Sequence, residues 1–395
     1  MTVSSSAHDR QGDSEYFADF TRRVMAARIP LDGSIELTHR CNLRCVHCFL
    51  GDQDAIRKHR HKEMSTKQVM ALIDEVVEAG ALNFTFSGGD PMMRKDFAEL
   101  YGYAVKKGLL VTVFCDGVLI SERIIEVFNR FPPANVEVSI YGATRKTYEA
   151  ITQVKGSFER CLAGIDRLHR NRRSFRLKTV LMTRNRHELE AMRALAKSYG
   201  VAFYFDTAVF PCLPHRDNGG RANQNRSEAA CASIDVALPS LDRPTALRVA
   251  PEDAAAAQLS DPEKVQELAD LYVRTKDIPE SDRLYVCGAG QSTFHVDPYG
   301  NLQPCVISTN VDYNLGDGGF LKGWNGPIAA IRDIRISADS SCKSCDKQSM
   351  CSGCPAMFFA ENNAGDRKSD YICRTTHALF DGIKDTVNAM LETSS

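Results

Sequence analysis

Short β-like segments alternate with helical segments from about residue 34 to 207, and this alternation restricts the possible folds more than any other feature of the sequence. The first unit pairs the strand SIELT (34–38) with the helix STKQVMALIDEVVEAG (65–80), whose N-cap residue is Ser65. The remaining strands are expected in NFTFSGG (83–89), LLVTVFC (109–115), NVEVSIYG (135–142), FRLKTVLMT (175–183) and VAFYFDT (201–207), with helices over 96–108, 120–131, 157–170 and 187–200. Repeated strand–helix units imply right-handed crossovers and a parallel sheet. Six units fall short of the eight in a closed barrel, so the sequence predicts an α/β fold with a partial (β/α)6 barrel.

Several chemically capable residues come at, or just after, the ends of these strands. They are Cys41, Gly88, Asp116, Tyr141 and Asp206. Ligands of parallel α/β folds gather at the carboxyl ends of the strands. We therefore expect these residues to share one face, with Asp116 and Asp206 directed toward a cavity.

The chain of 395 residues is long for one ordinary domain, and its pattern changes along its length. We divide it into an N-terminal extension (1–33), the partial barrel (34–207), a bridging region (208–286) and a cysteine-rich C-terminal region (287–395). The bridge begins with FPCLPHRDNGGRANQNRS, which is typical of a loop, and contains an amphipathic helix at 261–275. The stretch SSCKSCDKQSMCSGCP has too few apolar residues to fold by core burial, so metal ligation is expected to stabilise it. A final helix is expected over about 374–392.

The 14 cysteines indicate metal or redox chemistry. The N-terminal residues MTVSSSAHDRQGDSEYF contain no secretory signal, so disulfides are a poor explanation for so many thiols. No apolar run is long enough to cross a bilayer, and the net charge of −1 does not favour nucleic-acid binding. We expect a cytoplasmic protein without a membrane or nucleic-acid partner.

The stretch CNLRCVHC places Cys41, Cys45 and Cys48 directly after the first strand. Three thiolates hold three irons of a [4Fe–4S] cube and leave the fourth iron open to a substrate or cofactor. Two other sites fit the same three residues: a zinc site completed by His47 or His59, and a structural cluster completed by a distant cysteine.

The spacing C-x3-C-x2-C after a first strand resembles that of the radical S-adenosylmethionine (SAM) superfamily. The resemblance covers roughly residues 30–207 and extends to SGGDP (87–91), which stands where relatives carry GGEP, and to SIYG at the end of the fourth strand. It implies SAM contacts from Ser87, Gly88, Gly89, Asp90, Ser139, Tyr141 and Asn185, with Lys178 as a weaker candidate. A plain turn after the second strand would explain SGGDP equally well if it stood alone, and many relatives carry an acid at the position of Tyr141.

The C-terminal cysteines resemble the SPASM extension of radical SAM enzymes. GNLQPC (300–305) matches its G-x4-C, and the spacing from Cys342 to Cys351 matches its C-x2-C-x5-C, whereas Cys354 follows one residue too early. The resemblance implies two auxiliary iron–sulfur clusters, one held by Cys342, Cys345, Cys351 and Cys373 and one by Cys287, Cys305 and Cys354. The fourth position of the second set is open, or is filled by Cys212, Cys231 or a substrate thiol. A zinc ribbon of Cys342, Cys345, Cys351 and Cys354 is the alternative.

The remaining candidates carry weaker signals. Cys115 and Cys161 are expected to be structural, Cys212 lies near the expected mouth of the active site, and His295 is expected on the surface of a strand.

The resemblance implies a radical SAM oxidoreductase that abstracts hydrogen from a peptide and installs a crosslink or similar modification in a ribosomally made substrate. An electron donor such as flavodoxin or ferredoxin would reduce it. The 33 residues before the first strand are too few for a fused recognition domain, so a separate protein would present the peptide unless no leader is needed. The alternatives are formylglycine-type sulfatase maturation, cofactor-peptide or tetrapyrrole modification, and a non-catalytic iron–sulfur or zinc protein.

Overall fold

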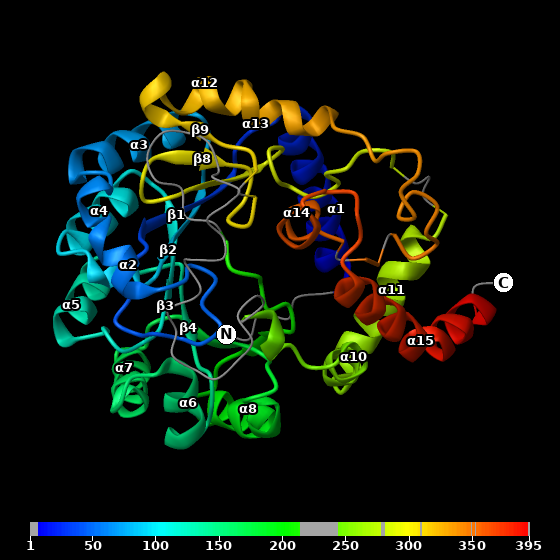
Figure 1. Ribbon diagram of the computed structural model, residues 1–395, viewed down its shortest axis with the longest axis horizontal. Coiled ribbons are helices and arrows are strands. Elements are labelled where there is room, and N and C mark those ends of the chain that lie inside the picture. The colour runs from blue at the N-terminus through cyan, green and yellow to red at the C-terminus, as the bar shows by residue number, and fades with distance from the viewer. Residues whose placement is uncertain are drawn as a thin grey trace.

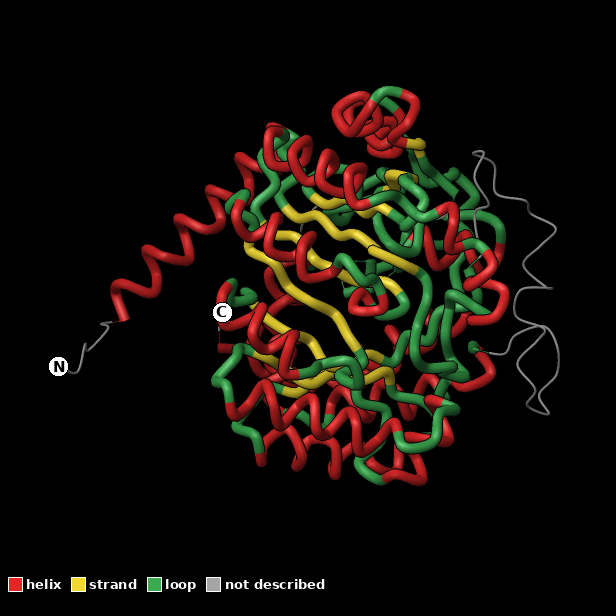
Figure 2. The backbone as a smooth tube through the Cα atoms, turned by 90° about the vertical axis from the view of Figure 1, so that its left-hand side faces the viewer, coloured by secondary structure: helices red, strands yellow, loops and turns green. Residues whose placement is uncertain are grey.

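A computed structural model describes residues 7–213, 244–277, 281–308, 310–348, 350–351 and 353–393. Its centre is one open sheet in the order β6-β5-β4-β3-β2-β1-β7-β8-β9 (Figures 1 and 2). The six strands expected from the sequence are β1 (Asp32–Thr38), β2 (Asn83–Gly88), β3 (Leu110–Cys115), β4 (Asn135–Ser139), β5 (Phe175–Val180) and β6 (Phe203–Asp206). All neighbours among them pair in parallel, which confirms the predicted α/β fold with a partial barrel.

Three further strands extend this sheet beyond β1, which the sequence analysis did not anticipate. They are β7 (Thr293–Val296), β8 (Asn301–Gln303) and β9 (Tyr313–Asn314). β7 pairs in parallel with β1, starting at Asp32 opposite Thr293, and β8 and β9 follow in antiparallel order. The cysteine-rich part of the chain is therefore joined to the barrel sheet through backbone hydrogen bonds.

Helices on the outer side of the sheet include the five predicted from the sequence and one more, Arg145–Thr152, that was not predicted. They are α3 (Thr66–Glu78), α4 (Phe97–Lys106), α5 (Glu122–Arg130), α6 (Arg145–Thr152), α7 (Ser157–Arg170) and α8 (Leu189–Ser198), with the short α2 (Gln53–Lys58) and turns η1 (Arg60–Lys62), η2 (Pro91–Met93) and η3 (Arg186–Glu188) between them. Ser65 caps α3 in a capping box with Gln68, as its position predicts. Buried side chains of the strands and these helices, including Phe84, Phe86 and Tyr101, form the main core.

The remaining helices precede β1 or follow β6 in the chain (Figure 1). They are α1 (Ala7–Ala27), η4 (Thr245–Leu247), α10 (Pro251–Leu259), α11 (Pro262–Thr275), η5 (Leu315–Asp317), α12 (Gly319–Asn325), α13 (Pro327–Ala330), η6 (Ile331–Asp333), α14 (Pro355–Asn362) and α15 (Asp370–Thr393). The expected bridging helix is α11, which packs with α10 against the C-terminal α15. Helix α1 extends away from the sheet and exposes Tyr16 and Phe17 (Figure 2).

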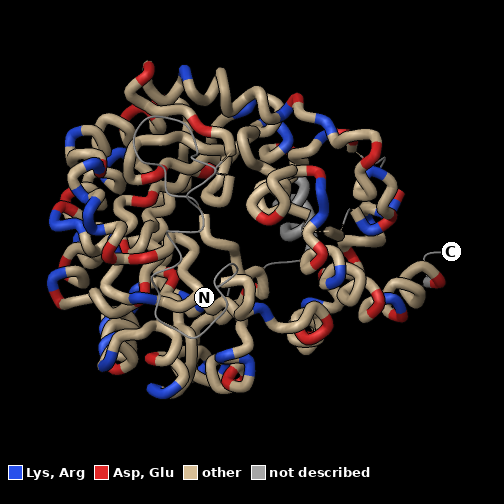
Figure 3. The backbone as a smooth tube through the Cα atoms, viewed as in Figure 1, with Lys and Arg blue, Asp and Glu red and all other residues tan. Residues whose placement is uncertain are grey.

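Charged residues of both signs are interspersed over the elements seen in Figure 3, in keeping with the net charge of −1. Among the described residues, no helix is both long enough and apolar enough to cross a membrane.

Candidate functional site

A cavity of about 220 Å³ lies at the carboxyl ends of the parallel strands. Its lining includes Cys41, Cys45, Cys48, Ser87, Gly88, Gly89, Cys115, Asp116, Ser139, Tyr141 and Lys178. Four of the five residues expected to share this face are therefore together. Asp206 is the exception, because it is exposed and accepts a hydrogen bond from the backbone N of Ala208 at 2.8 Å.

The loop that carries the three cysteines is held in place by hydrogen bonds from several elements. The backbone N of Cys41 donates to Oε1 of Gln53 in α2 at 2.7 Å, and the guanidinium of Arg57 donates to the carbonyl of Cys41 at 3.2 Å. On the other side, the backbone N of Arg44 donates to the carbonyl of Thr152 at 2.9 Å. Gln53 is buried, and no sequence motif singled it out.

The sulfur atoms of this loop lie in surroundings suited to iron–sulfur ligation. The backbone N of Leu43 lies 3.4 Å from Sγ of Cys41 and donates to it. Backbone N–H groups of Leu50 and Gly51 likewise hydrogen-bond the thiol of Cys48. Burial raises the pKa of all three thiols, so a bound cationic group is needed to hold them as thiolates. Such N–H···S bonds are among the features that tune cluster potentials.

The glycines of SGGDP are required by their contact with the start of the cysteine loop. The backbone N of Gly89 donates to the carbonyl of Thr38 at 2.8 Å, and that of Asp90 donates to the carbonyl of Arg40 at 3.0 Å. A Cβ atom at Gly89 would lie 2.4 Å from the carbonyl oxygen of Arg40. Only glycine lets the two loops approach this closely.

Asp90 lies behind the cavity rather than among its lining residues. Its carboxylate accepts hydrogen bonds from the backbone N of Met92 at 2.9 Å and of Asp116 at 3.1 Å, so it joins two strand-end loops. Burial, and then the neighbouring Asp116 carboxyl, raise the pKa of Asp90 well above its usual value. Burial also raises the pKa of Asp116, whose Oδ2 lies 3.8 Å from Sγ of Cys41.

Ser139 and Tyr141 line the cavity, and Tyr141 packs edge to face against His47 with ring centroids 4.5 Å apart. Burial lowers the pKa of His47 to about 4, so its ring is neutral at pH 7. The ring of His47, which stands directly before the third cysteine of the motif, therefore contacts Tyr141. His59, the other histidine considered for zinc, lies at the end of α2 and does not belong to the lining.

The two candidates near the fifth strand have different surroundings. Lys178 lines the cavity, where its Nζ lies 2.8 Å from Oε2 of Glu137 and 3.0 Å from the ring centroid of Phe114. Burial lowers the pKa of Lys178 to about 8. Asn185 is fully buried outside the lining, where its Oδ1 accepts a hydrogen bond from the backbone N of Met182 at 2.7 Å.

His295 is a buried residue, so its expected place on a strand surface was wrong. It is 1% exposed on β7, because β7 pairs with β1 inside the sheet. Its Nε2 lies 3.3 Å from Oε2 of Glu36, which also contacts Nε2 of His39 at 2.8 Å. Interaction with these histidines lowers the pKa of Glu36 despite its complete burial.

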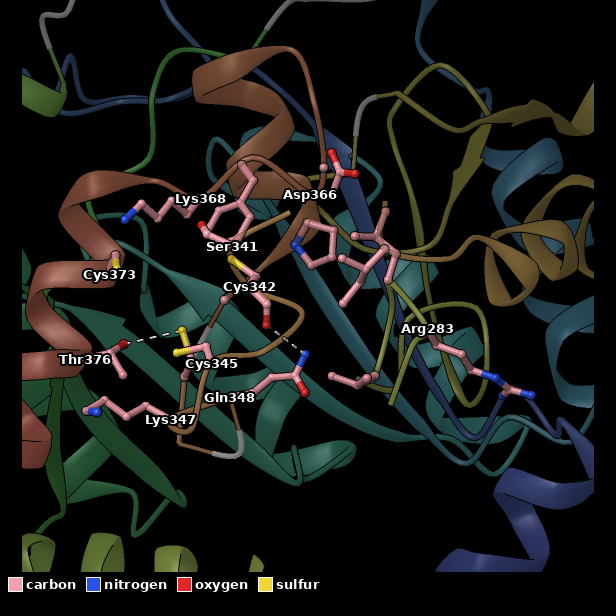
Figure 4. A pocket seen from close by; sticks show the side chains of 18 of the residues that line it. Arg283, Ser341, Cys342, Cys345, Lys347, Gln348, Asp366, Lys368, Cys373 and Thr376 are labelled. Carbon is pink, nitrogen blue, oxygen red and sulfur yellow. Dashed lines mark hydrogen bonds between the residues drawn. The ribbon is translucent and has the colours of Figure 1, made fainter. Parts of the chain in front are cut away.

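A second cavity, of about 170 Å³, lies in the C-terminal region (Figure 4). Cys342, Cys345, Cys351 and Cys373 all line it, together with Lys347, Lys368, Gln348 and Thr376. Three of these cysteines come from one loop, and Cys373 comes from α15.

Cys287, Cys305 and Cys354 form a separate neighbourhood. Burial, and then the nearby thiols of Cys354 and Cys287, raise the pKa of Cys305 to about 11. Cys354 is the N-cap residue of α14 and is not among the residues that line the second cavity. Among the described residues, no group of three His, Cys, Asp or Glu side chains converges closely enough to hold a single metal ion.

The four isolated cysteines have different places. Cys161 is buried in the core on α7, as expected, whereas Cys115 is buried and also lines the first cavity. Cys212 follows β6 and is disulfide-bonded, and Cys231 lies outside the described residues.

Residues 35–196 match the model of the radical SAM superfamily. This segment contains β2 to β5, most of β1, and the loops after these strands that line the first cavity. This segment is therefore a radical SAM domain. The resemblance seen in the cysteine motif is thereby confirmed, and it implies a [4Fe–4S] cluster and SAM.

Among curated relatives, an AdoMet-dependent heme synthase of Methanosarcina barkeri is 26% identical over 341 residues, which cover 82% of this chain and 91% of that protein. The mycofactocin maturase MftC of Mycobacterium ulcerans is 28% identical over 335 residues, or 82% of each chain. Among solved structures, SuiB of Streptococcus suis bound to the precursor peptide SuiA has a TM-score of 0.64 at 15% identity, covering 94% of this chain and 82% of SuiB. This last likeness concerns the fold.

Proposed function

We propose that this radical SAM enzyme abstracts a hydrogen atom from a peptide and installs a crosslink or another modification in a ribosomally made substrate. The observation that carries the proposal is the first cavity, where the three thiols of CNLRCVHC face the SGG backbone at the carboxyl ends of the strands. Similarity to MftC over most of both chains supports a peptide substrate.

In this proposal Cys41, Cys45 and Cys48 hold a [4Fe–4S] cluster whose fourth iron is left for SAM. When bound, the cluster and SAM supply a one-electron reductive cleavage that yields methionine and a 5′-deoxyadenosyl radical. The three thiols line a cavity and do not converge on one point that a single metal ion could occupy. This arrangement favours a cluster over a zinc ion, because a cubane cluster binds each thiolate through a different iron.

The other residues of the cavity orient SAM and keep water out. The backbone of Ser87, Gly88 and Gly89 lies along the wall, where it can contact the amino group of SAM, and Ser139 and Tyr141 lie on the side proposed for the ribose. Phe114, Val180 and Phe210 form apolar parts of the lining. In this proposal Asp90 and Asn185 do not contact SAM. Each positions a loop of the site by accepting a hydrogen bond from a backbone N–H group.

We further propose that Cys342, Cys345, Cys351 and Cys373 hold one auxiliary cluster and that Cys287, Cys305 and Cys354 hold another. The shared cavity of the first four thiols supports this grouping over a zinc ribbon, which would require Cys354 in place of Cys373. In this proposal the protein works in the cytoplasm, a flavodoxin or ferredoxin supplies electrons, and a separate recognition protein presents the peptide.

The test has two parts. Anaerobically reconstituted protein with dithionite and SAM is expected to release 5′-deoxyadenosine, and a short peptide encoded beside the gene is expected to change mass when co-expressed with the protein. Absence of 5′-deoxyadenosine from fully iron-loaded protein would overturn the enzymatic proposal.

Modification of a tetrapyrrole is the second candidate, because the similarity to the heme synthase spans 91% of that protein. Iron porphyrins added to the same assay distinguish the two substrates. A mass change in the porphyrin, with the peptide left unchanged, would replace the first proposal by the second.

A further inference from the structure

A buried hydroxyl group contacts one of the four thiols in the second cavity. Thr376 is 4% exposed, and its Oγ1 lies 3.5 Å from Sγ of Cys351. Figure 4 labels Thr376 and marks its hydrogen bond to a sulfur atom by a dashed line. Thr376 comes three residues after Cys373 on α15, so the two side chains lie on the same side of the helix and both line the cavity. One turn of α15 therefore supplies both a thiol and a hydroxyl to this site.

Thr375, the neighbouring threonine in α15, makes the hydrogen bond that is usual for a threonine hydroxyl inside a helix. Oγ1 of Thr375 donates to the carbonyl of Tyr371 at 2.9 Å, the common bond of a threonine to its own helix. The hydroxyl of Thr376 instead contacts a sulfur atom on a different segment of the chain. A thiolate has no proton to give, so once Cys351 ligates iron the hydroxyl must be the donor.

The side chain of Ser340 hydrogen-bonds the thiol of Cys342, and the backbone N–H of Gly353 hydrogen-bonds that of Cys351, so Thr376 is the side-chain donor to Cys351 beside one backbone donor. Two longer polar side chains of the cavity have other partners. The ammonium of Lys347 pairs with the carboxylate of Asp346 at 2.9 Å, and Nε2 of Gln348 lies 3.5 Å from the backbone carbonyl of Cys342 rather than from a sulfur atom. Burial raises the pKa of the Cys351 thiol, and the hydroxyl of Thr376 opposes this rise by stabilising the negative sulfur.

We propose that Thr376 is a positioning residue whose O–H···S bond to Cys351 raises the reduction potential of the auxiliary cluster held by Cys342, Cys345, Cys351 and Cys373. The inference rests on the cluster assignment in the proposed function. Reduction adds negative charge to the cluster and its thiolates, so a donor to sulfur stabilises the reduced form more than the oxidised form. The bond therefore favours uptake of an electron at this site.

The experiment compares Thr376→Val, Thr376→Ala and Thr376→Ser by anaerobic redox titration with electron paramagnetic resonance. The full chain is used with Cys41, Cys45 and Cys48 replaced by alanine, which leaves only the auxiliary clusters. The other auxiliary cluster serves as an internal reference. Thr375→Val is the matched control, since it removes the hydroxyl one residue away, which bonds the backbone carbonyl and the side chain of Tyr371.

Thr376→Val and Thr376→Ala are expected to weaken reduction of one cluster about tenfold, a shift of about 59 mV to lower potential for a one-electron couple. Thr376→Ser keeps the hydroxyl and is expected to keep the potential, as is Thr375→Val. An unchanged potential in both hydroxyl-free variants, with iron retained, would overturn the inference while leaving the cluster assignment standing.

Loss of iron in both hydroxyl-free variants but not in Thr376→Ser would assign Thr376 a structural role and would also overturn the inference. Failure of the proposed function gives a different result. If Cys342→Ala loses no iron relative to its parent, these four thiols hold no cluster, whatever Thr376 does.

Discussion

The two cysteine-lined cavities of this protein are built in opposite ways. The first is formed at the carboxyl ends of the six parallel strands β1 to β6, behind which lies the main apolar core. The second is lined by a loop with few apolar residues and by one face of α15. The first contributes three cysteines from its motif and the second contributes four. Under the proposed function, the fold positions a reactive, open site, whereas ligation itself stabilises a closed one.

The largest expected difference between the cavities concerns SAM cleavage. Cys45→Ala is expected to reduce 5′-deoxyadenosine to the level of the blank, because the first cluster then loses one of its three thiolates. Cys373→Ala is expected to keep most SAM cleavage in the absence of substrate but to lose modified product. Both quantities are measured by chromatography and mass spectrometry on anaerobic protein.

Iron content is the control for this pair, because each variant should retain the clusters that it does not touch. Equal loss of SAM cleavage in the two variants would contradict the division into an open catalytic site and closed auxiliary sites.

A smaller difference is expected from adding one methyl group beside each cavity. In Gly89→Ala the new Cβ would lie 2.4 Å from the backbone oxygen of Arg40. This oxygen cannot move away unless the cysteine loop shifts with it. We expect a loss of roughly 1–3 kcal/mol of stability and weaker SAM binding, measured by thermal unfolding and by titration with SAM.

Gly365→Ala is the matched variant in the C-terminal region. Its Cβ would lie 3.1 Å from the end of the Leu284 side chain, which can turn away. Little change is expected, and an equally large loss of SAM affinity in this variant would show that the close approach at Gly89 is not special.

The smallest expected effect is the titration of Lys178 in the first cavity. Burial lowers the pKa of its ammonium to about 8, so the free amine forms about two pH units earlier than in an exposed lysine. Only the free amine reacts with an acylating reagent. Competitive labelling followed by mass spectrometry should therefore show a midpoint near pH 8 for Lys178.

Glu137→Gln tests the cause of this value. The Glu137 carboxylate opposes the effect of burial by favouring the charged amine, so its removal should move the labelling midpoint to still lower pH. Exposed Lys343 in the cysteine-rich loop provides the reference. A midpoint of Lys178 equal to that of Lys343 would contradict the buried position.

Local signals in the sequence predicted the local structure well. Ser65, the expected N-cap, marked the start of α3, and the helix expected over 157–170 is α7. The spacing of CNLRCVHC and its place after β1 predicted the family and the position of the site, because both depend on residues close together in the sequence.

The sequence alone therefore predicted the partial barrel, the radical SAM domain and the place of Cys41, Cys45 and Cys48 at the ends of the strands. The tertiary structure decided that β7 joins β1, which buried His295 against Glu36, since parallel pairing across some 260 residues leaves no local pattern. It also decided that Cys373 and not Cys354 shares the second cavity, and that Thr376 rather than Thr375 faces a thiol. Those outcomes depend on the direction in which a helix presents its side chains to a distant loop, which only packing fixes.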